Sequence, residues 1–272
     1  TVAALLPQQW EIRLVDQNVR PLADTDLEWA DLVLTGGMIT QQKEILALID
    51  QSHDEGKPVV VGGADPTSQP HLYQQADFLV LGEGEVTIPL WIEDLARGAT
   101  CGAYQSDLRA DMAAAVVPRF DLIRLADYMR VGIQFSRGCP FNCEFCDIIE
   151  LFGRTPRTKT PAHMVAELQR LYDLGHRGHV DLVDDNFIGN KSKAIEVLQA
   201  IGAWSEQRGY PFYFSTEASI NLAKQGELLR LMQETDFRYV FVGFESPDED
   251  VLTETQKVQN KRISAVDAVR TL

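Results

Sequence analysis

Three of the four cysteines lie within eight residues of one another, in the segment SRGCPFNCEFC at 136–146. Cys139, Cys143 and Cys146 cannot all form disulfides with the single distant Cys101, so metal binding or catalysis is favoured over a disulfide framework. Thiolates ligate iron–sulfur clusters, and one short loop with three of them can hold three corners of a cubane. The fourth iron would then stay open to a small ligand.

Zinc is the main alternative for this loop. A structural zinc site needs four closed ligands, and only His163 or His176 could complete one, by folding back. The spacing therefore favours an iron–sulfur cluster over zinc and over a chance grouping of thiols. The loop also follows an expected strand directly, at the end where α/β folds place their active sites.

Acidic side chains follow the three strands that come after the cysteine loop. They are Asp184 and Asp185, then Glu217, then Glu245. A carboxylate in this position can accept hydrogen bonds from a ribose diol or an ammonium group. Alternatively, the two aspartates only cap the next turn and Glu217 pairs with an arginine. Their shared position at one rim of the fold favours a ligand site.

Glycines gather where the strands of the first hundred residues end. Glycine lets the backbone approach a large flat ligand at the crevice of a doubly wound sheet, although tight turns between strand and helix also use it. No G-x-G-x-x-G follows a strand, so a dinucleotide site is not supported. The residues concerned are Gly36, Gly37, Gly62, Gly63, Gly82 and Gly84, with Glu83 between the last two.

The segments that carry these glycines alternate between short apolar strands and helices. This alternation predicts a parallel sheet covered on both faces, in a flavodoxin-like (Rossmann-like) domain over residues 1–110. Residues 1–7 resemble the end of a first helix, so the first strand is expected to lie upstream of residue 1. Strands are expected at 11–16, 31–35, 58–61 and 78–81, and helices at 40–55 and 85–97.

The same alternation resumes after a polar, alanine-rich linker at 111–128. Four strand–helix units follow, whereas a closed or nearly closed barrel has six or eight, so residues 129–272 are expected to form a C-terminally truncated (β/α) barrel. Strands are expected at 131–136, 179–183, 211–216 and 238–244. Helices are expected at 161–174, 191–208 and 222–234, with another beginning near Arg262.

The composition of the chain limits its class. The 272 residues are 45% hydrophobic and 24% charged, which is typical of a globular protein without low-complexity segments. A net charge of −15 argues against a nucleic-acid partner. No apolar run is long enough to cross a membrane. Closely spaced free cysteines favour a reducing cytoplasm.

The cysteine loop and several further phrases resemble the cobalamin-binding radical S-adenosylmethionine (SAM) family that includes the hopanoid methylases. The loop has the spacing C-x₃-C-x₂-C with the aromatic Phe145 before the third cysteine. The other phrases are RTPRTKTP, VDDNFIGN, TEASINLA and VFVGFESPDE. The resemblance covers nearly the whole chain. It implies a 4Fe–4S cluster whose open iron binds SAM and whose electron cleaves SAM to methionine and a 5′-deoxyadenosyl radical.

The resemblance also implies roles for individual residues. Phe145 would lie beside the adenine of SAM. The end of the second barrel strand holds the amino group of SAM in the superfamily. Here the usual Gly-Gly-Glu is replaced by Val183-Asp184-Asp185, and Asp185 is the favoured residue. Glu217 and Glu245, at later strand ends, would hold the ribose and the carboxylate.

For the whole protein, the resemblance implies a cobalamin-dependent methyltransferase acting on an unactivated carbon, with cobalamin at the glycine turns. The alternatives are a cobalamin-dependent radical SAM rearrangement or cyclisation enzyme and a non-catalytic iron–sulfur or corrinoid carrier. A carrier would normally close all four cluster corners. The implied partners are a small-molecule or lipid-like substrate and an electron donor such as flavodoxin or ferredoxin.

Overall fold

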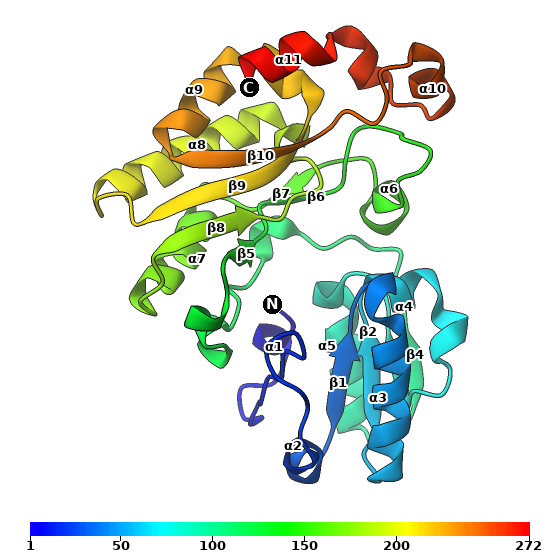
Figure 1. Ribbon diagram of the computed structural model, residues 1–272. Helices are drawn as coiled ribbons and strands as arrows, with labels where there is room; N and C mark the ends of the chain where they lie inside the picture. The colour runs from blue at the N-terminus through cyan, green and yellow to red at the C-terminus, as the bar shows by residue number, and fades with distance from the viewer. The chain divides into compact units, whose positions relative to one another are not determined.

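The computed structural model describes residues 1–272 and divides into two compact units, Thr1–Ala110 and Asp111–Leu272. Each unit is built around its own parallel sheet (Figure 1). The expected fold class, α/β with parallel sheets in both halves of the chain, is confirmed.

The sheet of the first unit has four parallel strands in the order β1-β2-β3-β4. Side chains alternate between the two faces of a strand, so Val59 and Val61 pack on one side and Val60 on the other. Helix α3 covers the first face and α5 covers the second, as a doubly wound sheet requires. The bounds are β1 Val33–Gly36, β2 Val59–Gly62, β3 Phe78–Val80, β4 Gly102–Tyr104, α3 Gln42–Asp54 and α5 Gly84–Ala96.

In the first unit, one expected strand is absent and one strand was not expected. Residues 11–16 form no strand, because no neighbouring strand of the chain pairs with their backbone. Conversely, β4 completes the sheet in a region without an apolar run, where its three residues pair with β3. The remaining helices are short: α1 Val2–Leu5, α2 Asp24–Trp29, α4 Ala64–Ser68, and the 3₁₀ turns η1 Ile39–Gln41 and η2 Pro70–Tyr73.

The second unit has a parallel sheet in the order β10-β9-β8-β5, with helices on one face (Figure 1). The helices α7, α8 and α9, which come after β5, β8 and β9 in the chain, pack back on the sheet, as in a (β/α) barrel. The turns before two of these helices are capped: Thr160 Oγ1 accepts from His163 N, and Asn190 Oδ1 accepts from Lys193 N. The bounds are β5 Val131–Ile133, β8 Gly178–Leu182, β9 Phe212–Ser219, β10 Phe237–Gly243, α7 Pro161–Asp173, α8 Lys191–Glu206 and α9 Gly226–Glu234.

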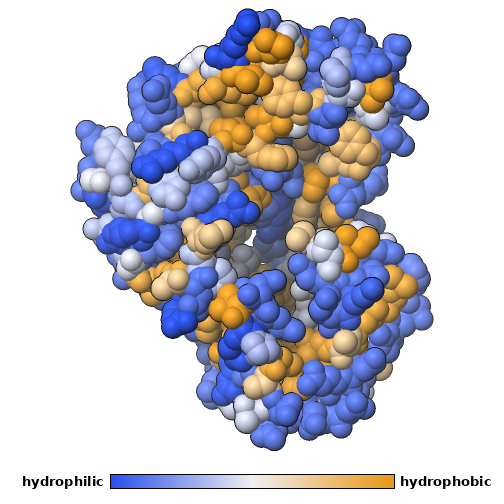
Figure 2. All heavy atoms as spheres, in the orientation of Figure 1, coloured by the Kyte–Doolittle hydropathy of each residue, from blue (hydrophilic) through white to orange (hydrophobic).

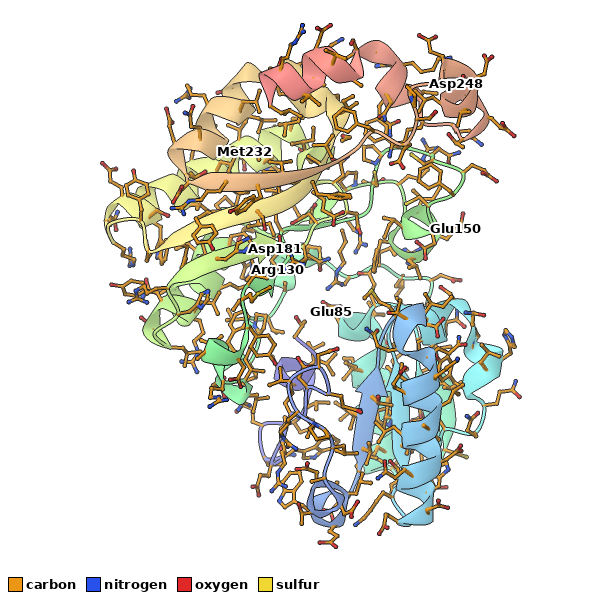
Figure 3. The ribbon with its side chains drawn as sticks, viewed as in Figure 1. Glu85, Arg130, Glu150, Asp181, Met232 and Asp248 are labelled. Atoms are coloured by element: carbon orange, nitrogen blue, oxygen red, sulfur yellow. The ribbon has the colours of Figure 1, made fainter.

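The sheet face of the second unit that lies away from these helices carries polar side chains. Asp181 lies 3.5 Å from Arg130 and accepts a hydrogen bond from Ser215, which in turn lies 2.7 Å from His179 Nε2. Figure 3 labels Arg130 and Asp181 at this face. In contrast, the helix-covered face carries the apolar core of the unit, which includes Val180, Leu182 and Phe214. This polar face continues toward the carboxyl ends of the strands, where Asp185 and Glu217 lie.

At the other edge of this sheet, β10 has one unpaired side. It exposes Tyr239 (62%) and Phe241 (71%), and apolar side chains gather over β10 and α11 in Figure 2. No helix is both long and apolar enough to cross a bilayer.

The remaining elements of the second unit are short. They are β6 Ser136–Arg137, β7 Arg157–Thr158, α6 Ile148–Phe152, α10 Glu249–Glu254, α11 Ala265–Thr271, η3 Met112–Ala114, η4 Phe120–Leu122, η5 Leu125–Asp127, η6 Phe187–Gly189, η7 Ile220–Lys224 and η8 Val258–Arg262.

Candidate functional site

The cysteine loop begins directly after β5 and β6, at the carboxyl end of the sheet. Backbone hydrogen bonds define its path: Cys139 N donates to Gly153 O at 3.2 Å, and Cys146 N donates to Cys143 O at 3.1 Å. Gly138 enters the loop at φ +91°, and a Cβ there would lie 2.8 Å from Gly153 O. The loop therefore needs glycine at this position, because both the φ angle and the close backbone exclude a side chain.

Each of the three loop sulfurs accepts at least one hydrogen bond. The N–H of Phe141 donates to Cys139 and the N–H of Ile148 donates to Cys146. Burial raises the pKa of the Cys139 and Cys146 thiols, and these donors oppose it. Cys143, only 8% exposed, accepts from a side chain. Donors directed at all three sulfurs suit a loop that works with thiolates.

The structure contains no group of three or more His, Cys, Asp or Glu side chains close enough to hold one metal ion. A cubane attaches each cysteine to a different iron, so this finding concerns single-ion sites and not a cluster. Neither His163 nor His176 turns to the cysteines: His163 contacts Thr160 Oγ1, and His176 lies 3.1 Å from His179 O. Cys101 is exposed and belongs to the first unit.

Asp184 holds the start of the cysteine loop. Its carboxylate is 1% exposed and accepts from Phe135 N at 3.0 Å, from Ser136 N and from Ser136 Oγ. Burial raises its pKa to about 7, against the hydrogen bonds from Ser136 and Phe135. With both oxygens already occupied by the strand that leads into the loop, Asp184 has a positioning role.

Asp185 differs from its neighbour in having an available oxygen. Its Oδ2 is buried and accepts no hydrogen bond, while the backbone N–H of Gly138 donates to the carboxylate. Burial, followed by the charge of Glu217, raises the pKa of Asp185 to about 6. An unpaired buried acceptor is costly unless a ligand fills it. The ammonium group of SAM fits this requirement, because it has three donors and a positive charge.

The other acidic strand ends are in different environments. For Glu217, on β9, burial and the charge of Asp181 raise the pKa, and the positive charge of Arg130 opposes them. Glu245, in contrast, forms an ion pair with Lys257. Phe145 is 54% exposed, with Lys257 Nζ 5.4 Å from its ring centroid. The structure thus brings Asp185 and Glu217 close to each other near the loop, whereas Glu245 is paired with Lys257.

In the first unit, the glycine turns line up along one sheet edge. Gly36 pairs with Gly62, and Gly62 with Val80, so the turns after β1, β2 and β3 are neighbours. A Cβ at Gly36 would lie 2.2 Å from Gly62 O, and Gly63 has φ +105°, so packing alone requires glycine at these two positions. The other turn residues are Gly37, Gly82, Glu83 and Gly84, of which Glu83 is turned inward: it is 4% exposed and accepts from Ala110 N.

One hydroxyl connects two of these turns. Thr67 Oγ1 donates to Gly63 O at 2.7 Å and accepts from Gly82 N at 2.9 Å. Thr67 is not among the residues that the sequence motifs predict for a site. The same is true of Asn186 and Gln259, whose amides contact the cysteine sulfurs. Asn186 directly follows the acidic pair and could have been included with it. Nothing in the sequence marks Thr67 or Gln259.

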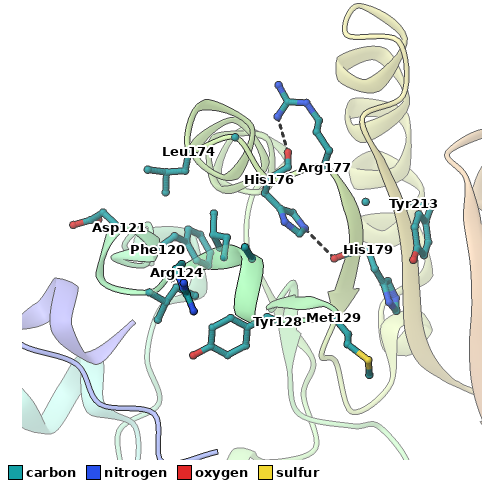
Figure 4. Close-up of a pocket in the computed structure, with 15 residues that line it drawn as sticks. Phe120, Asp121, Arg124, Tyr128, Met129, Leu174, His176, Arg177, His179 and Tyr213 are labelled. Atoms are coloured by element: carbon teal, nitrogen blue, oxygen red, sulfur yellow. Dashed lines mark hydrogen bonds between the residues drawn. The ribbon is translucent and has the colours of Figure 1, made fainter. Parts of the chain in front are cut away.

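A cavity of about 690 Å³ lies at the opposite end of the second sheet (Figure 4). Its lining comes from the segments just before β5 and β8 and from the first residues of β8 and β9, and it includes Tyr128, His176 and Tyr213. These are the amino ends of the strands, whereas α/β barrels bind their ligands at the carboxyl ends. The cavity is therefore separate from the site at the cysteine loop.

Comparisons with known proteins agree with this geometry. Residues 133–272 match the radical SAM superfamily, and residues 1–91 match the B12 binding domain. The fold and the cysteine loop thus define a radical SAM enzyme. The chain belongs to the radical SAM superfamily, in the family that joins this barrel to a cobalamin-binding domain.

Several curated relatives match almost the whole chain, and two of them are at least 38% identical to it. An uncharacterized methyltransferase of Synechocystis sp. is 49% identical over 99% of the chain and 51% of its own length. The hopanoid C-2 methylase of Rhodopseudomonas palustris is 38% identical over 100% of the chain and 52% of its own length. The chain therefore spans about half the length of these relatives.

Solved structures share the fold at low sequence identity. OxsB, with aqua-cobalamin and SAM bound, aligns over 93% of this chain and 40% of its own, with a TM-score of 0.71 and 17% identity. TsrM from Kitasatospora setae, with cobalamin and a [4Fe-4S] cluster, aligns over 90% of this chain and 57% of its own, with a TM-score of 0.73 and 16% identity. The expected cofactor set of 4Fe–4S cluster, SAM and cobalamin is confirmed by the two matched domains.

Proposed function

We propose that this chain is the cofactor-binding part of a cobalamin-dependent radical SAM methyltransferase that acts on an unactivated carbon of a small-molecule or lipid-like substrate. The observation that carries the proposal is the three-cysteine loop beside an unpaired buried carboxylate, in a chain that also has a B12 binding domain. The relatives named as methyltransferases support the reaction type.

In this proposal the chain's own residues bind and orient the cofactors. Cys139, Cys143 and Cys146 ligate the cluster, and Asp185 and Glu217 accept hydrogen bonds from the bound SAM. Phe145 covers the adenine. The cofactors supply radical formation and methyl transfer when bound. The protein contributes position and the exclusion of water, and position alone is worth several kcal/mol, on the order of 7–11 in well-oriented systems.

In the first unit, the proposed ligand surface is the edge formed by the glycine turns. Gly37, Gly82 and Gly84 follow strand ends without side chains, which leaves backbone free to approach a corrinoid ring. Gly36, Gly62 and Gly63 would contribute in the same way. Because the side chain of Glu83 is directed inward, only the backbone of Glu83 can contribute to this surface.

The experiment that tests the proposal uses the full-length protein, reconstituted anaerobically with iron, sulfide and cobalamin. With a strong reductant and SAM carrying a deuterated methyl group, it should form 5′-deoxyadenosine and transfer the label to the substrate. A hopanoid is the first probe, because the Rhodopseudomonas palustris relative is a hopanoid C-2 methylase. Formation of 5′-deoxyadenosine with an unlabelled, rearranged or cyclised product would instead establish the alternative reaction.

The proposed setting is the cytoplasm, where a flavodoxin or ferredoxin would supply the electron. The support is chemical, since free thiols that carry a cluster require a reducing compartment. Incubation of the reconstituted protein with reduced, purified flavodoxin tests the electron donor. The loss of visible absorbance of the cluster measures its reduction. No reduction by flavodoxin or by ferredoxin would contradict this part of the proposal.

A glycine replacement tests the corrinoid surface. Gly84 begins α5, and an added Cβ would meet only the side chain of Ile88, with Cδ1 at 3.0 Å and Cγ1 at 3.7 Å. Gly84→Leu should therefore fold but weaken cobalamin binding at least tenfold, measured by equilibrium dialysis. Gly226→Leu is the matched control, because Gly226 begins α9 and faces open space. Equal cobalamin affinity in Gly84→Leu and the unmodified protein would remove Gly84 from the site.

A further inference from the structure

A segment far along the chain packs on the cysteine loop. Residues 255–260 lie more than a hundred positions after the loop, yet Glu144 N donates to Thr255 O at 3.0 Å. The side chain of Asn142 donates to Gln256 Oε1 at 2.7 Å. Lys257 lies over the ring of Phe145. The loop and this segment, called the 255–260 segment here, therefore form one structure.

The 255–260 segment is fixed from its other side as well. Asn260 Nδ2 donates to Gly243 O at 2.9 Å and to Phe244 O at 2.8 Å, at the end of β10. Asn260 is 6% exposed, so these bonds are shielded from water. A side chain just before this anchor therefore has a defined position relative to the loop.

That side chain is Gln259, which is 4% exposed. Its Nε2 donates to the sulfur of Cys143 at 3.4 Å. The opposite assignment of the amide is unfavourable, because Oε1 and a thiolate are both acceptors. Cys143 is also the most buried of the three cysteines, which makes each donor that reaches it more effective.

Asn186 makes a comparable but longer contact, from Nδ2 to the sulfur of Cys139 at 3.8 Å. The direction of its amide is fixed, because Oδ1 accepts from both Ser219 N and Ser219 Oγ at 3.1 Å. Cys139 also has the N–H of Phe141 as a donor. The contribution of Gln259 to Cys143 should therefore be the larger of the two.

We propose that Gln259 is a positioning residue that raises the reduction potential of the cluster, through its hydrogen bond to the Cys143 ligand. Reduction adds a negative charge to the cluster and its sulfurs, and a donor to a sulfur stabilises the reduced form more than the oxidised form. The electron comes from an external one-electron reductant. The proposal depends on the cluster and not on the methyl-transfer reaction, so the two can fail separately.

The test compares variants of the reconstituted full-length protein by redox titration, with the reduced cluster followed by electron paramagnetic resonance. Gln259→Met keeps a similar volume and removes the donor, so its midpoint potential should be more negative. The cluster should also be lost to a chelator roughly tenfold faster. Gln256→Met is the matched control: it lies on the same segment, does not contact a sulfur, and should leave the potential unchanged.

Gln259→Lys separates a hydrogen-bonding role from a purely structural one. A lysine keeps a donor and adds a positive charge, so the potential should shift in the opposite direction, to a more positive value. If Gln259→Met fails to retain a cluster, the proposal is tested by the sign of the shift in midpoint potential of Gln259→Lys. Unchanged potentials in the Gln259 variants, or equal shifts in Gln256→Met, would overturn the proposal.

Discussion

Cys143→Ala should abolish the iron–sulfur cluster. The thiol is 8% exposed, between the 139–146 loop and Gln259, so water cannot easily replace it as a ligand. The unmodified full-length protein, reconstituted anaerobically, should contain about four iron atoms per chain and show broad visible absorbance. The variant should show neither, as measured by iron and sulfide analysis and by absorption spectroscopy.

Cys101→Ala is the control for this experiment. Cys101 is exposed in the first unit, next to β4, and should be dispensable for the cluster. Its variant should bind iron like the unmodified protein. About one zinc per chain without iron-dependent absorbance would contradict the cluster assignment, as would a full iron content in Cys143→Ala.

The second large effect should separate two neighbouring aspartates. Asp185→Asn should weaken SAM binding by about tenfold to a hundredfold, because a hydrogen bond to a charged group is worth about 1.5–3 kcal/mol. The fold should change little, since Asp185 Oδ2 has no partner within the protein. Isothermal titration calorimetry of the reconstituted protein, with SAM as ligand, measures this difference.

Asp184→Ala should act mainly on stability. It leaves the buried N–H groups of Phe135 and Ser136 without an acceptor, at a cost of about 1–3 kcal/mol for each. The midpoint of thermal unfolding should fall by several degrees. Equal effects of the two substitutions on SAM affinity, with equal stability, would show that the distinction between Asp184 and Asp185 is wrong.

The parts of the fold that follow local rules were predictable from the sequence. Val59–Val61 is a short apolar run between turn residues, and helix α7 begins with Thr160 as cap and Pro161 in its first turn. The cysteine loop was also visible, because its three ligands are close in sequence. In each of these cases, the residues that determine the local structure lie within about ten positions of one another.

The features that were missed depend on partners far away in the chain. Residues 11–16 have a strand-like apolar pattern but no neighbouring strand to pair with. Strand β4 has only a weak apolar pattern, yet it pairs with β3. Likewise, Gln259 is an ordinary glutamine until folding brings it to Cys143, 116 residues away. Glu245 lies at the expected rim, but Lys257 provides it with a positive charge that spacing could not reveal.

The bridge made by Thr67 has a thermodynamic consequence. One hydroxyl joins Gly63 O to Gly82 N, so the turns after β2 and β3, which belong to the proposed corrinoid surface, keep their separation without a ligand. Little ordering entropy then remains to be lost in binding, which is the advantage of a preorganised receptor. Thr67→Val keeps the shape of the side chain and removes both hydrogen bonds. The two turns should then be more flexible, and cobalamin should bind with a slower association rate and a larger entropic penalty.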